Sequence, residues 1–249
     1  MLKTKFIYGL IGKEIDYSFS RNYFNQKFKN EGLVNSLYEN FDCKNLAQAI
    51  EALKHKNLKG VNVTIPYKEK IIPYLDNISK EAKDIMAVNT ISFNNQGELI
   101  GHNTDCYGFQ KSLFENINKK TKNALILGTG GASKAIRYVL KRNSIKYKTV
   151  SRKRNQGDFI YIELDRDIMS NFELIVNTTP LGTYPNTEKC PDINFDHITK
   201  NHILFDLIYN PIKTTFLKNG KIKGAKTVNG YDMLIYQAEK SWSIWNEIN

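Results

Sequence analysis

Residues 123–133 read Asn-Ala-Leu-Ile-Leu-Gly-Thr-Gly-Gly-Ala-Ser, which is an apolar strand that enters a glycine loop. The helix predicted after the loop carries apolar residues at i, i+3, i+4, i+7 and i+8 from Ala132 to Leu140, and residues 146–150 form the next strand. A strand, a glycine loop, a helix and a second strand make the unit that binds a dinucleotide pyrophosphate on helix-terminal N–H groups. Because Ser133 stands at the third glycine of Gly-x-Gly-x-x-Gly, the order of the elements carries more weight than the motif.

The end of the second strand indicates which dinucleotide is bound. An NAD site would place an acidic residue there for the ribose 2′-hydroxyl, whereas this chain has Ser151, Arg152, Lys153 and Arg154. Arginine pairs with a phosphate group through a planar fork, so the cluster suits the 2′-phosphate of NADP. A solvated basic turn is the alternative. Further on, Asn177 ends another apolar strand, at the edge of the sheet where ligands of α/β proteins sit.

Residues 60–68 read Gly-Val-Asn-Val-Thr-Ile-Pro-Tyr-Lys and take a short strand into a turn. Pro66 favours the first turn of a helix, which would put Lys68 near a helix N-terminus, where the macrodipole disfavours a cation. A lysine held there could serve as an acid or a base. A solvated surface position is nevertheless the usual fate of a single lysine.

The elements around this stretch alternate between strand and helix, which predicts an α/β protein with a parallel sheet. We predict strands at 6–12, 33–38 and 60–63, helices at 21–30 and 46–53, short helices at 68–74 and 78–86, and a hairpin within 88–102. Ser20 is the predicted N-cap of the helix at 21–30. Residues 103–105 would cap a helix over 106–117, and we place the first domain boundary there.

The composition bears on the class of protein. The 249 residues are 41% hydrophobic and 24% charged, as in globular proteins, and no apolar run approaches the roughly 18 residues of a membrane span. The net charge of +11 comes from Lys and Arg scattered along the chain, which favours attraction for anionic small molecules over nucleic-acid binding. The three cysteines and four histidines show no ligand spacing, so we expect no metal. The N-terminus has no signal-peptide pattern, which favours the cytoplasm.

Seven short motifs, in one order, make the sequence resemble the shikimate dehydrogenase family over nearly its whole length. They are Ser18-Phe19-Ser20, Asn-Val-Thr-x-Pro-x-Lys at 62–68, Ala-Val-Asn-Thr at 87–90, Gly-x-Asn-Thr-Asp-x-x-Gly at 101–108, the glycine loop at 128–133, Tyr-x-Pro-x-x-Thr at 209–214, and Gly-x-x-Met-Leu-x-x-Gln at 230–237. Any one motif is weak evidence, but seven in this order are strong. The chain departs from the family at Glu14, Tyr17, Arg21 and Thr183, and Tyr17 and Arg21 concern the entrance of the substrate pocket more than the chemistry.

The resemblance implies a role for each matched residue. Ser18 and Ser20 would hold the substrate carboxylate, and Lys68 and Asp105 would be the catalytic pair. Further substrate-binding residues would be Thr64, Asn89, Tyr209 and Gln237. The cofactor-binding residues would be Gly128, Gly130, Gly131, Ala132, Ser133, Ser151, Arg152, Lys153, Asn177, Thr178 and Gly230.

The resemblance and the element pattern together predict two α/β domains with a cleft between them. Residues 1–104, completed by the C-terminal segment 230–249, would bind the substrate, and residues 105–229 would form a Rossmann-like NADP-binding domain. The last helix carries an apolar stripe, and Gln237 lies at its edge.

The expected activity is the reversible, NADPH-dependent reduction of 3-dehydroshikimate to shikimate, a step towards aromatic amino acids in the family. The expected form is a monomer or a homodimer that binds small molecules and neither nucleic acid nor membrane. One alternative is a quinate/shikimate dehydrogenase with relaxed cofactor use. The basic cluster at 152–154 argues against it. The other is a catalytically silent sensor of NADP and a cyclic polyol acid. The retention of both Lys68 and Asp105 argues against it.

Overall fold

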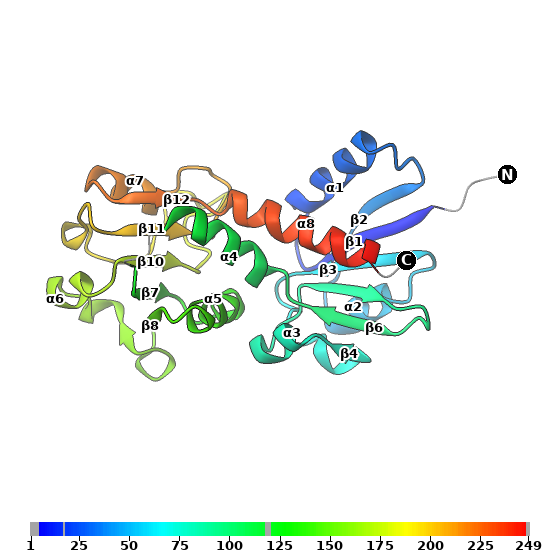
Figure 1. Ribbon diagram of the computed structural model, residues 1–249, viewed down its shortest axis with the longest axis horizontal. Coiled ribbons are helices and arrows are strands. Elements are labelled where there is room, and N and C mark those ends of the chain that lie inside the picture. Colours follow the sequence, from blue (N-terminus) through cyan, green and yellow to red (C-terminus); the bar gives the residue numbers. More distant parts are fainter. Residues whose placement is uncertain (1–4, 17, 118–120, 248–249) are drawn as a thin grey trace. The chain divides into compact units, whose positions relative to one another are not determined.

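The computed structural model describes residues 5–16, 18–117 and 121–247, and the chain divides into two compact units. Unit 1 comprises residues 1–104 and 238–249, and unit 2 comprises residues 105–237. Each unit contains one six-stranded sheet with helices packed against it (Figure 1). The predicted α/β class with two domains is therefore confirmed.

Unit 1 is built on a mixed sheet with the strand order β2-β1-β3-β5-β6-β4. Its elements are β1 (Phe6–Gly12), α1 (Phe19–Asn30), β2 (Ser36–Asp42), α2 (Leu46–Ala52), β3 (Leu58–Val63), the 3₁₀ turn η1 (Ile72–Tyr74), β4 (Asn77–Ile78), α3 (Lys80–Ile85), β5 (Thr90–Phe93) and β6 (Leu99–His102). Strands β2, β1 and β3 are parallel, and β5 runs antiparallel to both β3 and β6. The predicted β5–β6 hairpin is thus present, and it makes the sheet mixed rather than wholly parallel.

The side chains of β1 alternate between the two faces of the unit 1 sheet. Ile7 and Ile11 belong to the core that packs on α2. Tyr8 and Leu10 belong to a second core, which contains residues of α1 and of the C-terminal helix α8 (Tyr231–Glu247) (Figure 1). Because successive strand residues point to opposite faces, one apolar strand serves both cores.

Unit 2 is built on a parallel sheet with the strand order β12-β11-β10-β7-β8-β9. Its other elements connect these strands or cover the sheet. In chain order the elements are α4 (Asp105–Asn116), β7 (Asn123–Leu127), α5 (Gly131–Arg142), β8 (Lys146–Ser151), η2 (Arg154–Gln156), β9 (Phe159–Ile160), η3 (Tyr161–Glu163), α6 (Arg166–Ser170), β10 (Leu174–Asn177), η4 (Phe195–His197), β11 (Ile203–Asp206), α7 (Thr215–Ile222) and β12 (Lys226–Val228). The predicted strand, glycine loop, helix and strand are β7, residues 128–130, α5 and β8.

Two local predictions in unit 1 were wrong. Residues 64–71 form turns, closed by hydrogen bonds from Tyr67 N to Thr64 O at 2.9 Å and from Ile71 N to Tyr67 O at 3.0 Å, and no α-helix begins there. Lys68 therefore does not lie at the N-terminus of an α-helix, and no helix dipole acts on it there. Helix α1 begins at Phe19, so its N-cap is Ser18, whose extended backbone lets its side chain accept from Ser20 N at 3.2 Å.

Helix α8 contributes to both units. Its first turns belong to unit 2, because a Cβ at Gly108 of α4 would lie only 2.5 Å from Met233 O and 3.0 Å from Gln237 N. Lys111 of α4 also lies over the ring of Tyr236, 4.1 Å from its centroid. The chain consequently re-enters unit 1 at Ala238, later than the predicted residue 230.

Candidate active site

The proposed substrate residues of unit 1 lie on segments that backbone hydrogen bonds join. Thr64 N donates to Ile11 O at 2.9 Å, which ties the segment after β3 to the end of β1. Val88 N donates to Lys68 O at 2.8 Å, and Val63 N donates to Asn89 O at 2.9 Å. Since β1 and β3 are parallel, the segments that follow them leave one edge of the sheet. Thr64, Lys68 and Asn89 are therefore held by the same piece of backbone structure, and Thr64 and Lys68 are half-buried.

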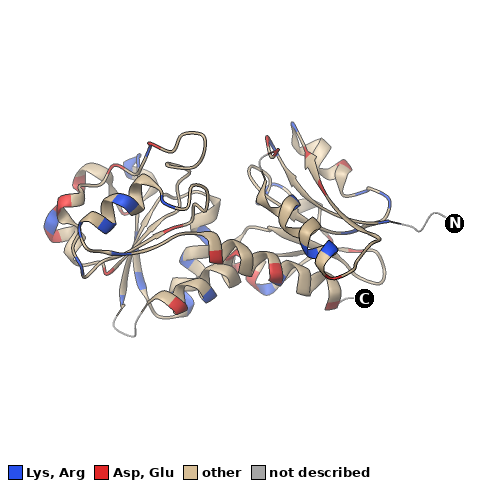
Figure 2. Cartoon of the chain, turned by 90° about the horizontal axis from the view of Figure 1, so that it is seen from above, with Lys and Arg blue, Asp and Glu red and all other residues tan. Residues whose placement is uncertain are grey.

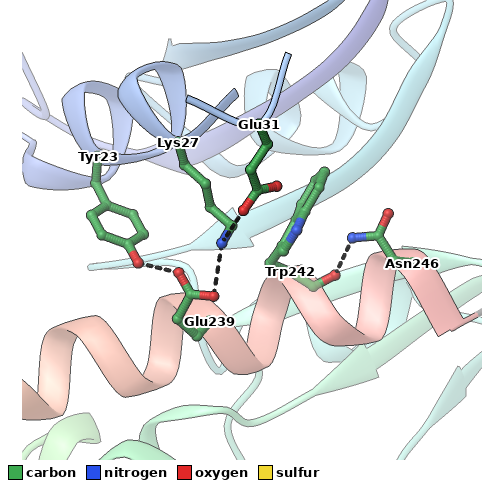
Figure 3. Close-up of polar contacts among 6 residues, drawn as sticks. All are labelled: Tyr23, Lys27, Glu31, Glu239, Trp242 and Asn246. Carbon is green, nitrogen blue, oxygen red and sulfur yellow. Dashed lines mark hydrogen bonds and ion pairs between the residues drawn. The ribbon is translucent and has the colours of Figure 1, made fainter. Parts of the chain in front are cut away.

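Helix α1 presents the two serines from its first turn, where both are half-buried. The helix is fastened to α8 by Glu239, which accepts a hydrogen bond from Tyr23 and pairs with Lys27 Nζ at 2.9 Å (Figure 3). Of the two departures from the family beside the serines, Arg21 is exposed, and Tyr17 lies outside the described residues. The position of the serines thus depends on the attachment of α1 to α8.

A buried polar network, which the sequence motifs do not predict, supports the unit 1 residues. The Asn62 carboxamide is its centre: Oδ1 accepts from Tyr38 Oη at 2.8 Å, and Nδ2 donates to Thr90 Oγ1 at 3.1 Å and to Ser241 Oγ at 3.0 Å. Burial raises the pKa of Tyr38 well above its ordinary value, and a hydrogen bond with Ser20 only partly opposes this rise. An Asn inside an otherwise apolar strand was the signal for this network in the sequence.

The network extends to the residue before Asp105. Thr104 is buried, and its hydroxyl lies 3.2 Å from Thr90 Oγ1 and 3.1 Å from Ser241 Oγ. The Asn89 carboxamide accepts from Thr104 N at 2.7 Å. Asp105 follows as the first residue of α4, where a carboxylate interacts favourably with the helix dipole. Asp105 is therefore part of the helix and not only a cap before it.

The two remaining proposed substrate residues belong to unit 2. Gln237 is 9% exposed and lies close to Gly108, one turn of α4 after Asp105, while its Nε2 donates to Leu234 O at 3.0 Å. Tyr209 is half-buried and follows β11. Asp105 and Gln237 are thus near each other on the α4–α8 pair of unit 2.

The loop after β7 contains one glycine with a positive φ and one beside open space. Gly128 has a φ of +108°, which disfavours any side chain. Gly130 is the N-cap of α5 with a φ of −76°, and a Cβ there would meet nothing within 4 Å. The fold alone therefore does not explain a glycine at 130, whereas a ligand that approaches the backbone closely does. With the N–H groups of the first turn of α5, the loop fits the pyrophosphate of a dinucleotide.

Two of the predicted cofactor residues support the loop from inside. Ser133 is fully buried, and its hydroxyl donates to Gly130 O at 2.7 Å. Asn177 is also fully buried, and its carboxamide donates to Asp206 Oδ1 at 3.0 Å and accepts from Thr179 N at 3.0 Å. Thr178 donates twice to Leu127 O, through N at 3.0 Å and Oγ1 at 2.8 Å. The side chains of Ser133 and Asn177 have no surface to offer a ligand, so they hold the loop.

Packing within unit 2 explains why residue 230 is a glycine. A Cβ there would lie 2.1 Å from the carbonyl oxygen of Leu207, because the start of α8 passes directly over the segment after β11. No side chain can fit in that space. A direct role in cofactor binding is therefore not needed to explain this glycine.

The basic cluster follows β8, as the sequence predicted, and adjoins η3. Ser151 is buried and accepts from Lys153 N at 3.2 Å, whereas Arg152 and Lys153 are exposed. Burial raises the pKa of Tyr161 in η3 to about 12, and the charge of Arg152 opposes that rise. Arg154 forms an ion pair with Glu163 at 2.7 Å. Arg154 is exposed as well, but Glu163 offsets its charge, so Arg152 and Lys153 are the stronger candidates to bind a 2′-phosphate.

A buried carboxylate, to which no sequence motif assigns a role, lies at the end of β11. Asp206 is fully buried and accepts from Thr214 Oγ1 at 2.6 Å and from Ile208 N at 3.1 Å, in addition to Asn177. Burial raises the pKa of Asp206 to about 6, although these hydrogen bonds act in the opposite direction. Its carboxylate joins the loops after β10 and β11, which border the predicted cofactor site.

Lys and Arg are distributed over the helices and loops of both units (Figure 2). Among residues 5–16, 18–117 and 121–247, no group of three His, Cys, Asp or Glu side chains is arranged to hold a metal ion. Within the same ranges, no helix is long and apolar enough to span a bilayer.

Comparison with known proteins places the chain in a family. Residues 10–91 match the family model for the shikimate dehydrogenase substrate binding domain. The shikimate dehydrogenase (NADP(+)) of Methanococcus maripaludis strain S2 is 42% identical over 263 aligned residues, which cover 99% of this chain and 93% of that protein. The shikimate 5-dehydrogenase of Thermus thermophilus, solved with NADP(H) and shikimate, is 28% identical with a TM-score of 0.86 and covers 97% of this chain and 94% of its own.

A second solved structure differs in its nucleotide. The shikimate 5-dehydrogenase of Listeria monocytogenes, solved with shikimate and NAD, is 28% identical with a TM-score of 0.83 and covers 98% of this chain and 92% of its own. The likeness to relatives extends over both units and includes one at 42% identity. The chain belongs to the shikimate dehydrogenase family.

Proposed function

We propose that this protein is an NADP-dependent shikimate dehydrogenase, which catalyses the reversible reduction of 3-dehydroshikimate to shikimate. The observation that carries the proposal is the 42% identity to a shikimate dehydrogenase (NADP(+)) over 99% of this chain, with every residue of the proposed site present. The enzyme would act in the cytoplasm as a monomer or a homodimer.

Residues of unit 1, together with Asp105, Tyr209 and Gln237 of unit 2, would supply the groups that bind and protonate the substrate. The hydroxyls of Ser18 and Ser20 would bind the ring carboxylate, and Thr64, Asn89, Tyr209 and Gln237 would orient the ring hydroxyls. Support for this comes from the shared backbone structure that holds Thr64, Lys68 and Asn89, and from the buried network beneath them. Fixed donors of this kind cost no reorganisation when charge develops on the substrate.

Unit 2 would hold the cofactor, as the open space at Gly130 and the N–H groups of the first turn of α5 suggest. Gly128, Gly130, Gly131 and Ala132 would take the pyrophosphate, with Thr178 beside them. Arg152 and Lys153 would bind the 2′-phosphate through charge-assisted hydrogen bonds. NADPH supplies the hydride when it is bound.

Lys68 and Asp105 would manage the proton. Reduction of a ketone leaves negative charge on the oxygen, so the site needs an acid and a nearby positive charge. The ammonium group of Lys68 would donate a hydrogen bond and a proton to that oxygen. Lys68 would regain a proton from solvent after product release, and the carboxylate of Asp105 would accept a hydrogen bond from the neighbouring substrate hydroxyl. In the oxidation direction, Lys68 would accept the proton.

An absorbance assay tests the proposal. Purified protein is mixed with NADPH and 3-dehydroshikimate, and the loss of reduced nicotinamide absorbance is followed, with shikimate and NADP⁺ as the reverse reaction. We expect saturable turnover in both directions. Saturable binding of both ligands without consumption of NADPH would instead identify a sensor, and faster turnover with quinate would identify a quinate dehydrogenase.

A further inference from the structure

We propose that Glu163 limits how strongly the cofactor site prefers NADP over NAD. The inference rests on the proposed function, which places the adenosine ribose at the carboxyl end of β8, and it concerns the choice between a 2′-phosphate and a 2′-hydroxyl. Glu163 lies outside the family motifs, in the short turn η3 that follows β9.

Both oxygens of the Glu163 carboxylate have fixed partners. Oε2 accepts from Ile160 N at 2.8 Å, and Oε1 pairs with a terminal nitrogen of Arg154 at 2.7 Å. Ile160 is the residue of β9 that pairs with Ser151, the last residue of β8. A carboxylate is therefore held one strand away from the position at which Rossmann-type sites recognise the ribose 2′ group.

Glu163 is charged at neutral pH. The Ile160 N–H and then Arg154 lower the pKa of Glu163 below its ordinary value. Its side chain is 30% exposed, whereas that of Arg154 is 72% exposed. The acid is thus the anchored partner of this ion pair, and the arginine is the partner that solvent and ligands reach.

This arrangement acts against a 2′-phosphate in two ways. Glu163 occupies an N–H group of Arg154 and offsets its charge, so Arg152 and Lys153 remain as the effective cations of the cluster. The fixed carboxylate also repels a phosphate group, which carries about two negative charges near neutral pH. A 2′-hydroxyl carries no charge and is not repelled. Removing the charge of Glu163 should therefore improve binding of the phosphorylated ribose selectively.

The variant Glu163→Gln tests this without removing the anchor, because the Gln side chain keeps an oxygen that can accept from Ile160 N. The probes are 2′,5′-ADP and 5′-AMP, which differ only in the 2′-phosphate, and calorimetry measures both dissociation constants. We expect Glu163→Gln to bind 2′,5′-ADP about two- to fivefold more tightly, the range of an exposed ion pair. Binding of 5′-AMP should stay unchanged.

The matched control is Asp158→Asn. Asp158 also pairs with an exposed base, Lys148 Nζ at 2.9 Å, and accepts from a backbone group, Thr149 N at 2.8 Å. It lies towards the other end of the β8–β9 pair, so the same change in net charge should leave the ratio of the two dissociation constants as in the wild type.

The ratio of the two dissociation constants decides the matter. If Glu163→Gln leaves it unchanged, or lowers the preference for 2′,5′-ADP, the proposal is wrong; the second result would mean that Glu163 positions Arg154 for the phosphate. In an Arg154→Gln background, the effect of Glu163→Gln should shrink. Wild-type protein that binds neither probe would also overturn the proposal. The assay contains no shikimate, so a failure of the proposed reaction would show as absent turnover with the ratio intact.

Discussion

The Asn89 carboxamide holds Thr104 through both of its polar atoms: Oδ1 accepts from Thr104 N at 2.7 Å, and Nδ2 donates to Thr104 Oγ1 at 3.0 Å. Thr104 is the last residue of the first segment of unit 1, and the proposed catalytic residue Asp105 is the next residue in the chain. Asn89 is thus proposed to contact the substrate and also fixes the backbone beside Asp105. The same side chain can influence both substrate binding and proton transfer.

We expect Asn89→Ala to lower kcat/KM for 3-dehydroshikimate by about tenfold to a hundredfold, or roughly 1.4–2.8 kcal/mol. The buried Thr104 N–H would lose its partner, which should reduce the free energy of unfolding by about 1–3 kcal/mol. Steady-state kinetics and urea unfolding measure the two effects.

Asn25→Ala is the matched control for Asn89→Ala. The Asn25 carboxamide makes a comparable two-point contact with Tyr38, accepting from backbone N and donating to backbone O, each at 2.9 Å. It should lose stability while most of the turnover remains. Equal loss of turnover in both variants would mean that Asn89 acts only through stability.

Lys68→Ala should lower kcat by about a hundredfold to ten-thousandfold, because general acid–base catalysis contributes that much. Binding of NADPH, followed by fluorescence titration, should change little. Lys70→Ala is the control, since Lys70 is an exposed lysine two residues further along the same turn segment. Near-normal turnover of Lys68→Ala would contradict the proposed catalytic role of Lys68.

Gly130→Ala should separate ligand binding from folding. A methyl group at 130 meets no atom of the protein, so the melting temperature should stay as in the wild type. It would stand where the pyrophosphate approaches the backbone, so the dissociation constant for NADPH should rise by about tenfold or more, or at least about 1.4 kcal/mol.

Gly230→Ala should do the reverse of Gly130→Ala. Its methyl group would collide with Leu207 O, which should reduce the free energy of unfolding by about 1–3 kcal/mol. Unchanged NADPH binding in Gly130→Ala would contradict the role of the loop.

Asp206 should make stability depend on pH. Its pKa is raised from 3.8 to about 6 in the folded protein, so the folded state prefers the protonated carboxyl group. The stability that protonated Asp206 contributes is therefore fully present below about pH 4 and is lost as the pH rises through about 6. A rise of about two pKa units corresponds to roughly 3 kcal/mol.

The variant Asp206→Asn removes the titration. Urea unfolding from pH 4 to 7 should therefore show the wild type losing stability relative to Asp206→Asn as the pH rises. A difference that stays constant over this range would contradict the prediction. Asp158 and Asp196, whose pKa values are lowered, act in the opposite direction in both proteins, so they cancel in the comparison.

The dinucleotide unit was predictable because its first strand, β7, is buried on both faces. The predicted strand at 123–127 is β7 (Asn123–Leu127), and the predicted strand at 146–150 is β8 without its last residue. A central parallel strand is a continuous apolar run, and a glycine loop marks where it ends. The hairpin β5–β6 was predictable because a Gly-containing turn separates its two strands.

The buried network of unit 1 could not be read from the sequence in the same way. Its contacts join residues far apart in the chain: Asn62 and Ser241 are 179 residues apart. An apolar or polar period identifies a face, but it does not say which polar groups meet across it. The turn around Lys68 was missed for a local reason, because Pro66 is compatible with both a first helical turn and a β-turn.

Trp245 in α8 packs so closely on β3 that a Cβ at Gly60 would lie 2.4 Å from its indole ring, and its Nε1 donates to Ile91 O at 3.0 Å. The core of unit 1 therefore needs the part of α8 from Ala238 onward, which the ribosome makes after all of unit 2. During synthesis, the first unit to begin would be the last to be completed, which reverses the usual N-terminal-first order of domain folding. Until α8 emerges, the nascent first 104 residues expose the apolar face that Trp245 later covers.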